Sequence, residues 1–398
     1  MNDDARAAAT FAARDSRARL LALLSAKTGD VIAAEDALAD AFETALRKWP
    51  VDGVPTKPEA WLLTVALNRA RDRFRSAAHK TSAPIEAAET IAMDMIDPTD
   101  IPDERLKMMF VCAHPAIDAA IRTPLMLQCV LSLEADRIAR AFLLPAGALS
   151  QRLVRAKRKI AAARIPFVKP SRADMAGRID AVLEAIYGAY AITWDGADED
   201  ITTEALYLAD LVVELSPEEP EALGLAALLC FSHARSDARQ GSEYVPLSEQ
   251  DTNVWNAQLI DRASNLLARA NKHKCMGRFQ LEAAIQAVHC NRRQVGHTDW
   301  RAIVALYEGL IALAPSTGAY VARAAAVGEA SGPEAGLNAL DATPYRDNRQ
   351  SDGHQSYWAT RAALLKAADH DAHGAYAKAI SLTTDPRIRR FLQRKQAE

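Results

Sequence analysis

The sequence predicts an all-α protein with two small helical domains, the second containing a helix-turn-helix, followed by a C-terminal domain of helical hairpins. Hydrophobic residues make up 49% of the chain, and glycine occupies only 17 positions. Alanine and leucine dominate the apolar share, which favours helix over strand. The length of 398 residues exceeds that of one typical domain. Two or three compact units are therefore expected.

Three helices are expected in the first domain, which spans 10–80. Apolar residues recur at helical spacing from Asp15 to Trp49, with a break at Lys27–Asp30 and a stop at Trp49–Pro50. After a loop, Pro58 can occupy the first turn of a longer helix that ends near His79. The second half of that helix is rich in arginine, which gives this domain a basic edge.

The next segment, 81–103, predicts an acidic linker because helical periodicity is lost and prolines recur. The second domain follows over 104–165. Thr123–Pro124 predicts an N-cap and first-turn proline that open a helix through Leu133. A short helix over Ala135–Phe142 and a longer one over Ala146–Ala163 then flank a tight break at Pro145. This is helix-turn-helix spacing.

The longer helix of this pair has an apolar face and a basic face. Leu149, Leu153, Ala156 and Ile160 share one side and are expected to point into the core. The outward side carries Gln151, Val154, Arg155 and Arg158, with Ser150, Arg152 and Lys159 on its flanks. From Gln151 to Lys169 there are seven lysines and arginines and no acid. Such a surface suits DNA phosphates and major-groove base edges, and the alternative is a solvated helix that binds nothing.

Two features of the first domain have more than one interpretation. Trp61 lies beside a loop that could hold an unstacked base, but it fits a core position better. The acidic helix over Ala33–Leu46 forms no acid/base pair in any pocket that the sequence identifies. We therefore interpret this helix as a protein-docking face.

The chain after the prolines at 166–170 is expected to form a domain of helical hairpins over 171–398. Leu208–Pro217 is similar to Leu306–Pro315, and a third copy lies at Ala375–Leu382. The first two copies are separated by about three periods of ~34 residues, the length of a tetratricopeptide repeat. A tetratricopeptide-like domain presents concave surfaces that suit proteins or peptides.

Composition argues against several other classes of protein. The net charge of -3 argues against a protein that coats nucleic acid through charge alone. The five cysteines show no C-x-x-C pair, and Cys112 with His114 lacks further ligands, so no metal or other cofactor is expected.

No apolar run approaches the roughly 20 residues that span a bilayer. We expect a cytoplasmic protein without a membrane segment. It is not expected to be an enzyme, since no catalytic set is visible.

These pieces, in this order, resemble the extracytoplasmic-function sigma factors of the sigma-70 superfamily. Ala34–Phe42 resembles the family's core-polymerase contact helix, and Ala60–Ala70 resembles its promoter-melting helix. Ile138–Phe142 and Gln151–Lys157 resemble the motif that reads the −35 element. Asp103–Phe110, with Cys112 and His114–Pro115, is similar to the subgroup that bears a C-terminal tetratricopeptide-like domain.

The resemblance implies an alternative sigma factor, with 10–80 as region 2, 104–165 as region 4 and a regulatory extension. Its partners would be promoter DNA and core RNA polymerase, through the β and β′ subunits. The extension would bind a small DGPF (YCII-like) protein or another regulator. The linker would thread the polymerase interior or serve as a solvated tether.

The resemblance also implies three sets of binding residues. Core polymerase would be contacted by Glu35, Asp36, Asp40 and Phe42. The −10 element would be engaged by the loop Asp52–Lys57, including Lys57, and by Asn68, Arg69, Arg73 and Arg75. The −35 element would be contacted by Ser150, Gln151, Arg152, Arg155, Arg158 and Lys159.

Two alternatives stay open at this point. One is a polymerase-independent helix-turn-helix transcription regulator with a tetratricopeptide sensor domain. The other is a tetratricopeptide interaction scaffold whose basic helices bind neither DNA nor polymerase.

Overall fold

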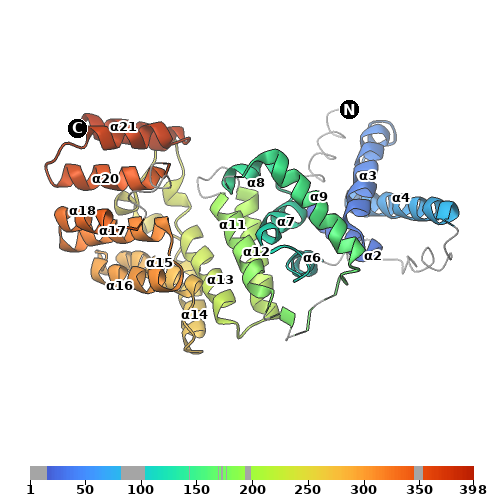
Figure 1. Ribbon diagram of the computed structural model, residues 1–398, viewed down its shortest axis with the longest axis horizontal. Helices are drawn as coiled ribbons and strands as arrows, with labels where there is room; N and C mark the ends of the chain where they lie inside the picture. Colours follow the sequence, from blue (N-terminus) through green and yellow to red (C-terminus); the bar gives the residue numbers. More distant parts are fainter. Residues whose placement is uncertain are drawn as a thin grey trace. The chain divides into compact units, whose positions relative to one another are not determined.

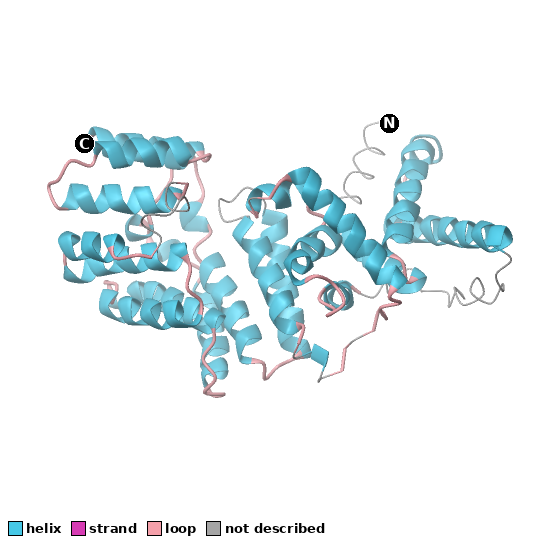
Figure 2. Cartoon of the chain, in the orientation of Figure 1, coloured by secondary structure: helices cyan, strands magenta, loops and turns pink. Residues whose placement is uncertain are grey.

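The computed structural model describes residues 16–81, 104–142, 144–168, 170–171, 174–175, 177–192, 199–344 and 353–398. Throughout these ranges the chain forms helices and turns but no strand, which confirms the predicted all-α class (Figure 2). The chain divides into two compact units, Met1–Ile192 and Thr193–Glu398. No helix in the described ranges is long and apolar enough to cross a membrane. Apart from its first residue, the acidic linker expected over 81–103 lies outside the described residues.

The first unit begins with α2 (Arg17–Thr28), α3 (Val31–Asp52) and α4 (Pro58–Thr81) (Figure 1). The break between α2 and α3 lies where the sequence predicts it. Gly29 ends α2 with a φ of 69°, and the carboxylate of Asp30 accepts hydrogen bonds from the backbone amides of Ile32 and Ala33. These two residues stop one helix and start the next.

The end of α3 differs from the prediction. The helix continues through Pro50 to Asp52, so the predicted stop at Trp49–Pro50 was wrong. Proline removes one backbone donor, but in the last turn this costs a single hydrogen bond. The backbone amide of Gly53 still donates to the carbonyl of Trp49 and closes the helix.

Residues 20–25 of α2 are buried on all sides, and the helix joins both halves of the unit. Leu20, Leu21, Leu23 and Leu24 are at most 2% exposed. The helix packs against α3 and α4, and also against α6 (Arg105–Cys112) and α7 (Ala119–Leu131). A helix that is apolar all round belongs in a core. The two predicted small domains therefore share one core in this unit.

α7 begins earlier than the sequence suggests. The carboxylate of Asp118 accepts a hydrogen bond from the backbone amide of Ala120, and Pro124 lies inside the helix. The predicted N-cap at Thr123–Pro124 was therefore wrong, because the cap is Asp118, five residues before Thr123. α7 ends at Leu131, where Ser132 takes a left-handed conformation with a φ of 53°.

α8 (Ala135–Ala141) and α9 (Ala146–Ala162) match the predicted helix pair to within one residue. The predicted inward face of α9 is buried, and its members Leu149, Leu153, Ala156 and Ile160 are at most 5% exposed. α9 packs against α7, α8 and α3.

The last helix of the first unit is α11 (Ile179–Ile192). It lies beyond the boundary expected near 170, yet it packs against α7 and α6. Val182, Leu183 and Ile186 on its inner face are at most 1% exposed. The core of the first unit therefore includes a helix that the sequence assigns to the extension.

The second unit contains ten α-helices in its described residues: α12 (Glu199–Leu215), α13 (Pro220–His233), α14 (Ala257–Asn271), α15 (Arg278–Val295), α16 (Trp300–Leu313), α17 (Thr317–Ser331), α18 (Pro333–Asp341), α20 (Gln355–Ala367), α21 (His373–Leu382) and α22 (Pro386–Ala397). α13 is its most buried helix and packs against α12, α14 and α15. From α15 onward the helices stack mainly on their neighbours in sequence (Figure 1). Such nearest-neighbour packing is typical of solenoid folds.

Helix α13 approaches α15 closely. A Cβ on Gly224 would lie 2.7 Å from the backbone nitrogen of Gln280, so glycine is required at this contact. The carboxylate of Glu221 accepts hydrogen bonds from the backbone amides of Phe279 and Gln280 at the start of α15. Glu221 thus satisfies two orphan donors and places a negative charge at a helix N-terminus.

A loop between α13 and α14 reaches the last helix of the second unit. The rings of Tyr244 and Phe391 are 5.2 Å apart. The carboxylate of Glu243 lies 3.8 Å from Arg390 and 3.4 Å from Arg394 on α22. This contact, which we call the clasp, joins residues about 150 positions apart, since the Glu243–Arg394 pair spans 151.

Candidate nucleic-acid interface

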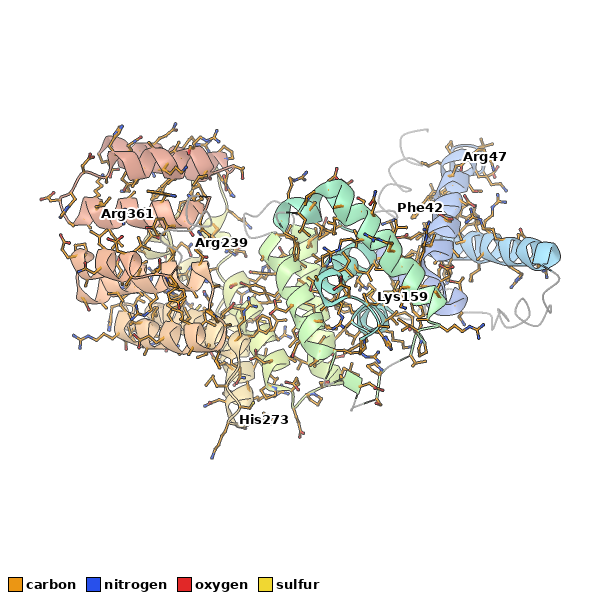
Figure 3. The ribbon with its side chains drawn as sticks, in the orientation of Figure 1. Phe42, Arg47, Lys159, Arg239, His273 and Arg361 are labelled. Atoms are coloured by element: carbon orange, nitrogen blue, oxygen red, sulfur yellow. The ribbon has the colours of Figure 1, made fainter. Side chains whose placement is uncertain are left out.

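The outward side of α9 is an exposed, largely cationic surface. Gln151, Val154, Arg155 and Arg158 are exposed and, with half-buried Ser150, line a shallow hollow. Lys159 is also exposed on this helix, where Figure 3 labels it. Positive side chains around an apolar patch can contact phosphates and the thymine methyl group together.

Arg152 lies at the edge of this surface, in a second hollow that Arg155 and Lys159 also line. Its side chain is half-buried, and its Nη2 is 3.3 Å from an Oδ2 of Asp118 at the start of α7. Asp118 is well exposed, so this pair contributes little to stability. Arg152 is held toward α7 and is less available to DNA than Arg155 or Arg158.

A second cationic surface lies on α4 and the loop before it. Asn68, Arg69, Arg73 and Arg75 are exposed along the helix, and Lys57 is exposed in the loop. All five residues predicted to contact the −10 element therefore reach solvent. This arrangement suits a single strand that tracks the helix through its phosphates.

Trp61 packs against the core of the first unit. It is half-buried, and its ring lies 5.5 Å from that of Trp49 at an angle of 61°. Trp49 itself is 2% exposed. An edge-to-face pair of this kind favours the structural interpretation of Trp61 over a base platform.

The acidic residues predicted on α3 are already paired with cations of the same unit. Asp36 lies 2.8 Å from Arg73, and Asp40 lies 4.0 Å from it. These side chains are 40–55% exposed, and exposed pairs contribute about 0.2–1 kcal/mol. Phe42 is half-buried on the same helix, where Figure 3 labels it.

Glu35 makes a different kind of ion pair. Its Oε1 lies 2.5 Å from the Nζ of Lys157 on α9, and the side chains are 22% and 7% exposed. Removing one partner of a buried pair costs about 3–5 kcal/mol, because the other charge is left uncompensated. This contact therefore dominates the electrostatics between α3 and α9.

Lys157 is a residue that our sequence analysis missed. It falls within the basic run and within Gln151–Lys157, the stretch that resembles the −35-reading motif. It also lies four residues after Leu153 and eight after Leu149. That spacing places it on the buried face of the helix. The periodicity therefore contained the signal, and the charge of the residue obscured it.

Cys112 on α6 and Cys129 on α7 are both buried free cysteines. A hydrogen bond between Cys112 and Cys129, together with burial, raises the pKa of Cys112 well above its usual value. Burial lowers the pKa of His114. In the described residues no group of three or more His, Cys, Asp or Glu side chains could hold a metal ion.

The sequence matches two protein families. Residues 13–80, which include α2, α3 and nearly all of α4, match sigma-70 region 2. Residues 178–271, from the start of α11 to the end of α14, match a family of unknown function, DUF6596. No solved structure matches the chain.

A curated relative extends the similarity over both units. An uncharacterized protein of Rhizobium meliloti (strain 1021) is 36% identical over 369 residues. The match covers 88% of this chain and 86% of the relative. Its extent means that the N-terminal and C-terminal parts occur together in both proteins. The chain thus belongs to the sigma-70 family, and it combines that family's region 2 with a DUF6596 domain.

Proposed function

We propose that this protein is an alternative sigma factor of the extracytoplasmic-function type. It binds the β and β′ subunits of core RNA polymerase and directs promoter-specific initiation in the cytoplasm. The observation that carries the proposal is the presence of two exposed cationic helix surfaces, on α4 and α9, in one unit with sigma-70 region 2.

The α4 surface engages the −10 element. The segment Asp52–Lys57, which is the end of α3 and the loop after it, holds an unstacked base of the non-template strand. Lys57, Asn68, Arg69, Arg73 and Arg75 contact the strand beside it. Exposure of all five side chains supports this assignment, and the Arg73–Asp36 pair is weak enough to give way to phosphate.

The α9 surface engages the −35 element, with α8 and α9 acting as a helix-turn-helix. Ser150, Gln151, Arg152 and Arg155 read or position the duplex, while Arg158 and Lys159 contact phosphate. A bidentate arginine–guanine contact is worth about 1–3 kcal/mol of discrimination. Exposure favours Arg155 over Arg152 as the reading arginine, because Arg152 is held by Asp118.

The C-terminal extension regulates initiation through a protein partner. Its stacked helices present surfaces suited to peptides or small proteins, and we propose a small DGPF (YCII-like) protein or another regulator as the ligand. It restrains the DNA-binding surfaces or stabilises the polymerase complex.

A run-off transcription assay tests the proposal. The purified chain is mixed with core RNA polymerase and a library of genomic fragments, and specific transcripts are sequenced. We expect transcripts that share −10 and −35 sequences and that require the chain. Tight binding to an operator without polymerase would instead favour a polymerase-independent regulator. Absence of both activities would favour an interaction scaffold.

A further inference from the structure

Lys157 is a buried cation on the helix that we assign to promoter reading. Its Nζ is 2.5 Å from Glu35, and only 7% of its side chain is exposed. Removing an ammonium from water is costly unless an opposite charge compensates for the lost solvation. Glu35 supplies that compensation from α3, which lies 122 positions away in the sequence. The packing of α9 on α3 therefore depends on this pair.

Glu35 is also one of the acids that the resemblance to sigma factors assigns to core polymerase. A carboxylate that already accepts a short contact from Lys157 cannot offer the same oxygen to a cation of another protein. Its neighbours Asp36 and Asp40 are held only by exposed contacts to Arg73, which are weak. Breaking the ion pair of Glu35 therefore destabilises the unit more than breaking those of Asp36 or Asp40.

We propose that the Glu35–Lys157 pair is an autoinhibitory latch, which keeps α9 on α3 in the free protein and competes with core RNA polymerase for Glu35. This inference rests on the proposed sigma-factor function. Docking on polymerase provides Glu35 with a new cationic partner. Lys157 then returns to solvent beside Arg158 and Lys159, which raises the positive charge of α9.

The latch couples two binding events. Polymerase binding favours the open unit, and the open unit has the more cationic DNA-reading helix. By linkage, DNA that binds the open form must strengthen polymerase binding by the same factor. The free chain is then a poor DNA binder, so promoter occupancy depends on polymerase.

The ion pair acts together with apolar packing. α9 also packs on α7 and α8, so the three helices move as one group. Opening must therefore loosen α2 from α6 and α7 as well. The apolar contacts stabilise the closed state, and the ion pair specifies which faces of α3 and α9 meet.

Chemical cross-linking between α3 and α9 tests the latch. Ala39 and Ala161 lie one helical turn beyond Glu35 and Lys157, and both retain some solvent exposure. Both are changed to cysteine in a Cys275→Ser background, since the other four native cysteines are buried. A reducible bismaleimide then joins α3 to α9, and Ala39→Cys alone, treated in the same way, is the control.

The closed form is expected to be inactive and recoverable. Cross-linking should lower run-off transcription at least tenfold, and cleavage of the linker should restore it. Full transcription by the cross-linked chain would overturn the latch and leave the sigma function intact. Failure of the reduced chain to direct any specific transcript would refute the sigma function, and the latch with it.

A single substitution measures the same equilibrium without a cross-link. In Lys157→Met the apolar stem is kept and the charge is lost, so the closed state is weakened. The Kd for core polymerase should fall about tenfold, or about 1.4 kcal/mol, and the cross-linking yield should fall in parallel. Lys27→Met, at an exposed lysine of α2 outside the assigned binding surfaces, is the matched control, which should alter neither. An unchanged Kd in a folded Lys157→Met chain would overturn the proposal.

Discussion

Ending the chain at residue 170 should unfold the first unit, whereas ending it after Ile192 should leave the unit folded. The difference is α11, which packs on α7 and α6. Four large side chains of its inner face, Ile179, Val182, Leu183 and Ile186, are at most 5% exposed. Each contributes about 1.5–3 kcal/mol through burial, so roughly 6–12 kcal/mol depends on the helix. A whole domain is stable by only about 5–15 kcal/mol.

Urea denaturation followed by circular dichroism of the chains 1–170 and 1–192 measures this effect. We expect a cooperative transition for 1–192 and a non-cooperative or absent one for 1–170. Within the intact chain, Ile186→Ala should destabilise the first unit by about 2–5 kcal/mol. Asp180→Asn, on the exposed side of the same helix, is the control. Equal transition midpoints for the two truncated chains would refute the assignment of α11 to this core.

Three further predictions concern other parts of the molecule. Gly224→Ala should destabilise the second unit by about 1–3 kcal/mol through overpacking against α15. Gly318→Ala is the control and should leave the stability unchanged, because nothing lies within 4 Å of its new Cβ. Thermal unfolding of the two variants measures the difference. Burial, aided by two nearby arginines, lowers the pKa of His289 to about 4. The unfolded chain therefore binds more protons between pH 6.5 and 4, so stability should fall by about 2 kcal/mol from pH 7 to pH 5, and His289→Gln should reduce that loss. Arg155→Ala should relax sequence preference at one −35 position by about 1–3 kcal/mol. Arg158→Ala should weaken binding to all promoters alike and reduce its salt dependence by about one phosphate contact. DNA binding of the polymerase complex at several salt concentrations measures both effects.

Local signals in the sequence predicted the helices well. The Gly29–Asp30 pair marks a helix end and an N-cap, and both act within a few residues. The apolar face of α9 follows directly from helical periodicity. Proline was less informative, because its cost depends on where in the helix it falls. Pro50 and Pro124 each predict a helix boundary, yet both lie inside helices.

Long-range partners could not be predicted in the same way. The exposed cations of α4 and α9 follow from helical periodicity, but the pairing of Glu35 with Lys157 depends on how α3 and α9 pack. Likewise, the periodicity of α11 shows an apolar face without showing which core receives it. Pairings between segments far apart in sequence arise from tertiary packing, which composition and spacing do not encode locally.

The clasp between the loop at Glu243 and helix α22 affects the order in which the second unit can be completed. Residues about 150 positions apart must meet, so the contact forms only after α22 has emerged from the ribosome. Contacts of such large sequence separation are entropically slow to form. Newly made chains should therefore pass through a period in which the early helices of the extension are stacked but their far end is unsecured. A chain without α22 cannot form the clasp, so its C-terminal extension should stay more sensitive to proteases than that of the intact chain.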